Sequence, residues 1–341
     1  MNPIQMFKLM ADQGPLNTVA FLNDWQTSIR MYFLYTGLQS GLFKALKIPC
    51  SKDALTEKLS PKRLDLFDAL LDVGLTTKEL GLNNGLYRLK GRRAKALAND
   101  PDEIFTGIVQ ANVTYYHIVF HDAAPRMAGG PLADLLEIYG DVIARFSRST
   151  EPFVLDFLQQ ALKKREAPRL LEIGCGSGVH LRSAHTINPK VSGTGIDINP
   201  KVAEAARKHI VEWGLDQQFN IVAGDIRNAP NGTEGPFDMI TLFNLIYYFK
   251  DDERPALFRQ LKEKLADDGV FLLVTMVSSK AKDAMAAALN LATVSEQGTT
   301  ALPDEQVLAD QLKVAGFSKV TFKRIMPKSS FMGFIANAGS A

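Results

Sequence analysis

Three glycines stand at alternate positions in the segment GCGSG, which follows a strand-like run, RLLEI, and precedes a helix-like one. Glycine at Gly174, Gly176 and Gly178 allows a tight turn and lets a ligand approach the backbone closely. The start of a helix behind such a turn presents unpaired N–H groups and a partial positive charge. The spacing does not match the G-x-G-x-x-G pattern of dinucleotide sites. Taken alone, the segment indicates either a ligand-binding loop or a tight turn.

An acidic residue lies at or near the end of each of three successive strand-like runs. Glu172 lies just before the first glycine, Asp197 ends the run GTGID, and Asp225 follows FNIVA. A carboxylate at Asp197 can accept hydrogen bonds from both hydroxyls of a ribose, and Asp225 can accept one from an adenine amino group. An acid at the end of a strand can also cap the following helix, and for Asp197 that alternative stays open. The order of the acids favours a nucleoside site.

A fourth strand-like run ends in FNLIYYFKDDE, which contains Asn244, Tyr247 and Tyr248. In an open α/β sheet, ligands bind outside the carboxyl ends of the strands. A site at this point would contain an amide and two phenols, but no histidine and no cysteine. A neutral phenol is a poor base near pH 7, because its unperturbed pKa is about 10.

Residues 169–276 resemble the class I S-adenosylmethionine-dependent methyltransferases. The resemblance rests on the series LLEIGCGSG, GTGIDINP, GDIRN, FDMITLFNLIYYF and LADDGVFLLVT. It implies S-adenosyl-L-methionine as the cofactor and assigns each conspicuous residue a part of it. These assignments are Gly174, Gly176 and Gly178 to the amino-acid and ribose end, Asp197 and Ile198 to the ribose, Asp225 and Ile226 to the adenine, Asn244 to the wall beside the methionine portion, and Glu172 to the orientation of the glycine loop.

The whole chain resembles the two-domain small-molecule O-methyltransferases. In much of that family a histidine at the end of the strand corresponding to TLFNLIYYF removes a proton from the acceptor. Here the position falls on Tyr247, followed by Tyr248. We therefore predict methyl transfer to a small molecule largely by positioning, without a histidine base, and with both tyrosines as the catalytic residues. S-methylation of a small thioether acid and C-methylation of a 2-oxo acid are the alternatives.

Other polar and aromatic residues could contact the substrate. His117 and His121 lie four residues apart in YHIVFHD, on one face of a helix, and could supply a base. The same spacing could bind a metal, but no third ligand is apparent, so we expect none; both could also pack at a helix face. Tyr115 and Tyr116 could line an aromatic pocket.

Two arginines, Arg145 and Arg148, precede the first strand of the predicted sheet. Either could bind a carboxylate of the substrate or cofactor, or lie at the surface. We assign no function to His180, His185 and His209.

Two halves of the 341-residue chain differ in the spacing of their apolar residues. Helical spacing dominates the first half, whereas strands and helices alternate from Arg169 onward, which predicts an α/β fold. We expect a helical, winged-helix dimerisation and substrate-roof domain over residues 1–165. Residues 166–341 would form the cofactor-binding catalytic domain, a seven-stranded, doubly wound, mostly parallel sheet. The last two strands, KVTFKRIM and FMGFIANA, have no helix between them and would pair as an antiparallel hairpin.

The winged helix is predicted from SKDALTEKL, a second helix, and a hairpin that turns at Asn84-Gly85. Such a unit could belong to a DNA-binding regulator. Its second helix, however, presents Asp65, Asp68 and Asp72 along one exposed face, which is poorly suited to phosphates. We therefore expect a homodimer through this half, and no nucleic-acid partner.

Composition agrees with a cytoplasmic protein. The formal net charge of +2 offers no reason to expect a polyanion as partner, and the two cysteines, Cys50 and Cys175, favour a reducing compartment. The start of the chain lacks the pattern of a signal peptide, and no apolar run is long enough to span a membrane.

Overall fold

The computed structural model describes residue 4, residues 15–280 and residues 282–339. The expectation that the chain starts without a signal peptide falls mostly on residues outside this description. The chain divides into two compact units, Met1–Asp122 with Leu135–Ser149, and Ala123–Asp134 with Thr150–Ala341. The predicted division of roles between residues 1–165 and 166–341 stays a prediction.

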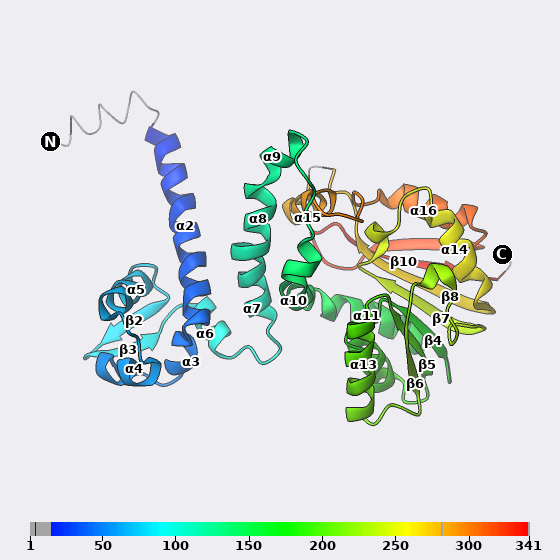
Figure 1. Ribbon diagram of the computed structural model, residues 1–341, viewed down its shortest axis with the longest axis horizontal. Helices are drawn as coiled ribbons and strands as arrows, with labels where there is room; N and C mark the ends of the chain where they lie inside the picture. Colours follow the sequence, from blue (N-terminus) through cyan, green and yellow to red (C-terminus); the bar gives the residue numbers. More distant parts are fainter. Residues whose placement is uncertain (1–3, 5–14, 281, 340–341) are drawn as a thin grey trace. The chain divides into compact units, whose positions relative to one another are not determined.

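The first unit is mainly helical, with one small sheet (Figure 1). Its described elements are α2 (Pro15–Gln39), α3 (Leu42–Ala45), β1 (Cys50–Ser51), α4 (Lys52–Leu59), α5 (Leu64–Thr76), β2 (Leu80–Asn83), β3 (Leu86–Leu89), α6 (Arg92–Ala98), α7 (Ile104–Gln110), the π-helix η1 (Ala111–Tyr115), α8 (Tyr116–His121) and α10 (Leu135–Ser147).

The winged-helix pattern is present in this unit. Helices α4 and α5 precede the β2–β3 hairpin, and β1 adds to it in the order β1-β3-β2. Asn84 and Gly85 both have positive φ, 49° and 74°, as the predicted two-residue turn requires. On α5, Asp65 contacts Arg63 and Asp68 contacts Lys52, so two of the three acids have basic neighbours.

The second unit contains the large sheet. Its described elements are α9 (Ala123–Met127), α11 (Glu151–Leu162), β4 (Arg169–Ile173), α12 (Val179–Ile187), β5 (Ser192–Asp197), α13 (Pro200–Glu212), β6 (Phe219–Ala223), the 3-10 helix η2 (Ile226–Asn228), β7 (Phe237–Phe243), the 3-10 helix η3 (Ile246–Tyr248), α14 (Arg254–Glu263), β8 (Leu265–Met276), α15 (Ala284–Val294), α16 (Glu305–Val314), β9 (Lys319–Arg324) and β10 (Phe331–Asn337).

Seven strands form this sheet in the order β6-β5-β4-β7-β8-β10-β9. Strands β4 to β8 pair in parallel, and β10 pairs antiparallel with both β8 and β9. The predicted sheet and its closing hairpin are therefore confirmed. From β4 the chain proceeds outward to β5 and β6, and then returns to β7 on the other side. This reversal creates a crevice at the carboxyl end of β4, where doubly wound sheets bind ligands.

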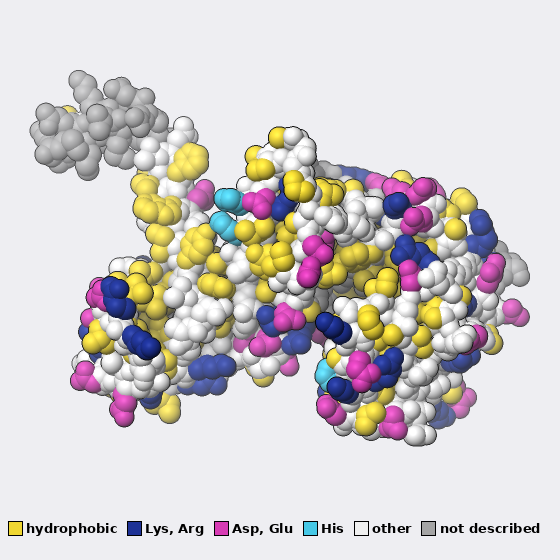
Figure 2. Space-filling view, viewed as in Figure 1, with side chains coloured by type: hydrophobic (Ala, Val, Ile, Leu, Met, Phe, Trp, Pro, Cys, Tyr) yellow, Lys and Arg dark blue, Asp and Glu magenta, His cyan; other side chains and the backbone are white. Residues whose placement is uncertain are grey.

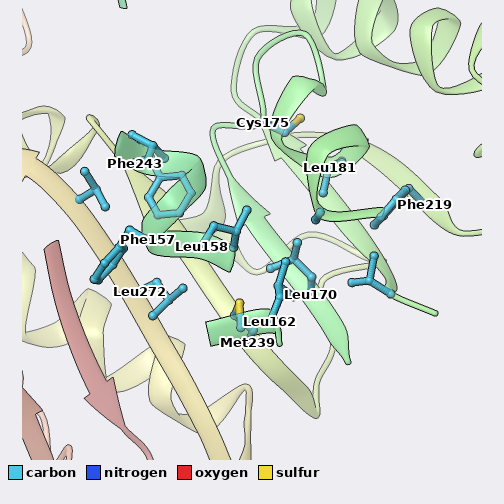
Figure 3. Close-up of a cluster of buried hydrophobic side chains, with 14 of the residues drawn as sticks. Phe157, Leu158, Leu162, Leu170, Cys175, Leu181, Phe219, Met239, Phe243 and Leu272 are labelled. Carbon is cyan, nitrogen blue, oxygen red and sulfur yellow. The ribbon is translucent and has the colours of Figure 1, made fainter. Parts of the chain in front are cut away.

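Each face of the sheet packs against its own layer of helices (Figure 1). Helices α11, α12 and α13 cover one face, and α14 and α16 cover the other. Figure 3 shows the first of these layers, where Phe157 and Leu158 of α11 lie over side chains of the strands, such as Leu170 and Leu272. The central strands β4 and β7 and the second half of β8 are buried on both sides, as is usual in a doubly wound sheet.

Among the described helices, none combines the length and the apolar character needed to span a membrane.

Candidate active site

The glycine loop joins β4 to α12 and bends sharply. Gly174, Gly176 and Gly178 all have positive φ, at 67°, 54° and 81°. The loop is tied to β5, because the N–H groups of Gly174 and Cys175 donate to the Ile196 carbonyl at 2.7 and 3.0 Å. A side chain other than hydrogen would be strained at the three glycine positions, which explains their identity.

Asp197 lies beside this loop at the end of β5. Its Oδ2 accepts a hydrogen bond from the Gly176 N–H at 3.1 Å, and its Oδ1 accepts one from the Asn199 N–H at 2.9 Å. The cap of helix α13 is Asn199, whose side chain accepts from Lys201 N–H and Val202 N–H. Asp197 is therefore not the helix cap that the sequence left open, and its carboxylate is half-buried at the glycine loop. The next residue, Ile198, is exposed.

Asp225 follows β6 and caps the short helix η2. It accepts a hydrogen bond from the Arg227 N–H at 2.9 Å, and the Arg227 side chain donates to the same carboxylate. Burial opposes ionisation, but the hydrogen bonds and charge of Arg227 outweigh it, so the pKa of Asp225 is lowered. Ile226 is buried beside it. An ionised Asp225 is thus held in place as a hydrogen-bond acceptor.

A buried pair that the sequence did not suggest lies next to the loop. Glu172 of β4 is 2% exposed, and its Oε1 lies 2.8 Å from Nδ1 of His180 in the first turn of α12. The His180 ring packs edge-on against Phe243, with the ring centroids 5.4 Å apart. The short strand–turn–helix connection brings the two residues together, although eight positions separate them in the sequence. The sequence predicts no function for His180.

The acceptor-side segment follows β7. Asn244 has a positive φ of 55°, and its N–H donates to the Val274 carbonyl at 2.7 Å. Tyr247 and Tyr248 follow in η3 with ring centroids 5.1 Å apart. Burial, reinforced by the negative charge of Glu296, raises the pKa of the Tyr248 phenol above its ordinary value. At neutral pH this phenol is therefore protonated and can donate a hydrogen bond.

A fully buried arginine fixes this segment. Arg254 is 0% exposed; its Nε donates to the Phe249 carbonyl at 3.0 Å and its Nη2 to Thr300 Oγ1 at 3.0 Å. Thr300 in turn donates from its backbone N–H and its hydroxyl to the Tyr247 carbonyl, at 2.7 and 3.0 Å. Arg254 is not among the residues that the sequence predicts to be functional. A signal existed, since its spacing places it on the buried face of α14 with Leu257 and Leu261.

The remaining predicted substrate residues belong to the first unit. Tyr115 is buried and packs edge-on against Tyr116 and Tyr139, at centroid distances of 4.9 and 6.1 Å. Burial raises the pKa of Tyr116 to about 12. His117 and His121 are both exposed, with ring centroids 5.6 Å apart.

His121 Nδ1 lies 2.7 Å from the neighbouring carboxylate of Asp122. Across the described residues, no three histidine, cysteine or acidic side chains come together as a metal site. Arg145 donates to Gln110 Oε1 at 2.9 Å, and Arg148 donates to the Asp102 carbonyl at 3.0 Å. Both arginines thus have partners inside the first unit.

Comparison with known proteins agrees with this geometry. The family described as "Methyltransferase domain" matches residues 146–321, just over half of the chain. The chain belongs to this methyltransferase family. The resemblance seen in the sequence is thereby confirmed.

Relatives of this methyltransferase include two named O-methyltransferases. A ubiquinone biosynthesis O-methyltransferase of Actinobacillus pleuropneumoniae is 28% identical over 127 residues, which cover 37% of this chain and 53% of the relative. A demethylspheroidene O-methyltransferase of Rhodobacter capsulatus is 24% identical over 286 residues, which cover 77% of this chain and 67% of the relative. This methyltransferase thus spans about half the length of the first of these relatives.

A solved structure extends the likeness to both units. Human N-acetylserotonin methyltransferase, crystallised with S-adenosylmethionine, has a TM-score of 0.69 and 18% identity, with 95% of this chain and 98% of that chain covered. The likeness confirms the fold class, a seven-stranded methyltransferase sheet that a helical N-terminal region precedes in the chain. The matched family and all three similar proteins are named as methyltransferases, and the alternative of a DNA-binding regulator is not favoured.

Proposed function

We propose that this methyltransferase transfers a methyl group from S-adenosylmethionine to an oxygen atom of a small molecule. The observation that carries the proposal is the position of three segments at the carboxyl ends of adjacent strands. The glycine loop follows β4, Asp197 ends β5, and the segment with Tyr247 and Tyr248 follows β7. These strands flank the reversal in strand order, where ligands of doubly wound sheets bind.

The residues at this edge fit the cofactor. Glu172 Oε2 is buried without a hydrogen-bond partner in the described chain, which suits a donor group of a ligand. A Cβ at Gly176 would meet no atom within 4 Å, so the backbone there is open to close approach. When bound, S-adenosylmethionine supplies a methyl group on a sulfonium centre. The proposed cofactor-binding residues are Glu172, Gly174, Gly176, Gly178, Asp197, Ile198, Asp225, Ile226 and Asn244.

The acceptor oxygen is proposed to be acidic, a carboxylate or a hydroxyl that ionises near neutral pH. The Tyr248 phenol is protonated there, since burial raises its pKa, and it cannot remove a proton. Tyr247 and Tyr248 would instead hold and align the acceptor oxygen by hydrogen bonds and contact. Catalysis is then mainly positioning and exclusion of water. The names of the relatives favour oxygen over the sulfur and carbon alternatives.

Methyl transfer to a panel of acceptors, read by mass spectrometry, tests this function. The panel holds carboxylic acids, acidic phenols, phenols with a pKa near 10, thioethers and 2-oxo acids. We expect turnover of acceptors that are ionised at pH 7 and little turnover of ordinary phenols. Exclusive turnover of a thioether or a carbon acid would contradict the proposal.

The predicted substrate-binding residues of the first unit need a separate test. Tyr115, Tyr116, Arg145 and Arg148 are proposed to contribute to substrate binding, with His117 and His121 as the alternative source of a base. For an ionised acceptor, replacing both histidines with alanine should leave kcat within a few-fold of wild type. A loss of several hundred-fold, with a rate that rises near the pKa of histidine, would show that one of them is the base.

We further propose that the protein is a homodimer through its N-terminal helices. Figure 2 shows hydrophobic side chains gathered along α2. Phe21, Trp25 and Tyr32 are 77%, 63% and 51% exposed and recur at helical spacing. Light scattering after size exclusion should give a dimer, and Trp25→Glu should give monomers. The matched variant Thr27→Glu, on the opposite side of the helix, should stay dimeric; monomeric wild type would contradict the proposal.

A further inference from the structure

Glu172 has one satisfied and one unsatisfied carboxylate oxygen. Its Oε1 lies 2.8 Å from His180 Nδ1, whereas Oε2 is buried and lacks a hydrogen-bond partner among the residues that the structure describes. A buried acceptor without a donor is unfavourable by about 1–3 kcal/mol. The unsatisfied oxygen therefore points to a donor that arrives with a ligand, at the strand end that leads into the glycine loop.

His180 is held in a defined orientation. It is the second residue of α12, two positions after Gly178, and its ring packs edge-on against Phe243 at the end of β7. The side chain is 28% exposed, so the ring joins buried Glu172 to the accessible edge of the sheet. Because the ring is fixed between β4 and β7, it determines which oxygen of Glu172 is left for a ligand.

The charge of the pair depends on a shared proton. Burial raises the pKa of Glu172, although the hydrogen bond from His180 opposes that shift. Burial lowers the pKa of His180, but its hydrogen bond to Glu172 and the negative charges of Glu172 and Glu151 outweigh this, and the result is a raised pKa. Asp197 is the other charged group that acts on Glu172. The Cys175 thiol of the loop stays protonated, since burial raises its pKa.

We propose that His180 is a positioning residue of the cofactor site, holding Glu172 so that Oε2 accepts a hydrogen bond from the ammonium group of the cofactor's amino-acid part. This inference rests on the proposed function. It has a consequence for binding: as pH rises, the pair loses its shared proton, its net charge becomes −1, and the positively charged ammonium group binds more tightly. A ligand without the amino-acid part would not respond.

Calorimetric binding of two ligands between pH 5.5 and 8.5 tests the inference on the full chain. S-adenosylhomocysteine carries the amino-acid part, and 5′-methylthioadenosine carries only the nucleoside and thioether. For the wild type, we expect the affinity for S-adenosylhomocysteine to rise about tenfold over this range, as for the gain of one charge-assisted hydrogen bond. The affinity for 5′-methylthioadenosine should stay constant.

Two variants of His180 separate the effect of its hydrogen bond to Glu172 from the effect of the pair's titration. His180→Asn keeps a neutral donor near the position of Nδ1, so it should retain affinity for S-adenosylhomocysteine but lose the pH dependence. His180→Leu removes the donor and should weaken that affinity about tenfold at pH 7.5. Neither variant should change the binding of 5′-methylthioadenosine. Unchanged binding of this ligand would also show that the loop is folded in both variants.

Other results would overturn the inference. If His180→Leu weakens the binding of both ligands equally, His180 only supports the fold of the loop. If the wild-type affinity for S-adenosylhomocysteine does not change with pH, the pair does not face the ammonium group. If the wild type binds neither ligand at any pH, the proposed function itself fails, a result distinct from the other two.

Discussion

The side chain of Leu245 fills the space that a Cβ atom at Gly174 would occupy. Gly174 is the first residue after β4 and Leu245 follows β7, so this contact joins the glycine loop to the acceptor-side segment. At Gly176, by contrast, a Cβ would meet no atom within 4 Å. The two glycines therefore serve different purposes: one allows two protein segments to pack together, and the other leaves room for a ligand.

Alanine substitutions should separate these purposes. Gly174→Ala combines a left-handed φ with overlap against Leu245, so we expect unfolding free energy to fall by about 2–4 kcal/mol. Gly176→Ala should lower the free energy of unfolding by only about 1–2 kcal/mol, since only the backbone is strained. It should nevertheless weaken S-adenosylhomocysteine binding about tenfold or more, because the methyl group occupies ligand space. Urea unfolding measures the stability of the two variants, and calorimetry measures their affinity for S-adenosylhomocysteine. Equal destabilisation by the two variants would contradict the different purposes of the two glycines.

Arg254 should be more important for stability than its position in a charged, surface-like sequence suggests. Arg254→Met removes the donors to the Phe249 carbonyl and Thr300 Oγ1, and should lower the unfolding free energy by about 2–3 kcal/mol. The methylation rate should fall as well, because Thr300 positions Tyr247. Arg259→Met on the same helix removes an exposed arginine and should stay within about 0.5 kcal/mol of wild type. Equal effects of the two variants would show that Arg254 does not position this segment.

Tyr247 and Tyr248 should act as hydrogen-bond donors and not as bases. Burial and Glu296 raise the pKa of Tyr248 above its ordinary value of about 10, so this phenol is neutral throughout pH 6–9. The pH profile of kcat should show no inflection from it in this range. Tyr247→Phe and Tyr248→Phe should each lower kcat/KM by about tenfold or less, the loss of one hydrogen bond. An inflection that disappears in a phenylalanine variant would instead identify that tyrosine as a base.

Stability should fall as pH rises through the titration of the Glu172–His180 pair. Both groups have a raised pKa in the folded state, so the folded protein binds more protons than the unfolded one. The stability that His180 contributes is present below its unfolded pKa of about 6.5 and is lost as pH rises through the higher folded value. His180→Asn should remove this decline. Thermal unfolding from pH 5.5 to 8.5 measures it, and parallel curves for wild type and variant would contradict the expectation.

Much of the architecture could be predicted because it depends on local signals. The strands of the large sheet carry runs of apolar residues, and Asn84-Gly85 is a turn that needs positive φ at both positions. The glycine loop, the acid that ends β5 and the acid that follows β6 could be placed on one edge, because parallel strands end at the same side of a sheet. That reasoning identified the methyltransferase family from short segments of sequence.

The partners of individual side chains depended on the tertiary structure. Sequence alone left Asp197 open as a helix cap, and only the structure shows Asn199 in that position and Asp197 at Gly176. The Glu172–His180 pair and the contact of Arg254 with Thr300 join segments that pack together only after the sheet and its helices have formed. Periodicity determines which face of an element is buried, because burial depends on the spacing of apolar residues. Which polar groups meet there depends on how distant segments pack, and no local pattern in the sequence specifies that.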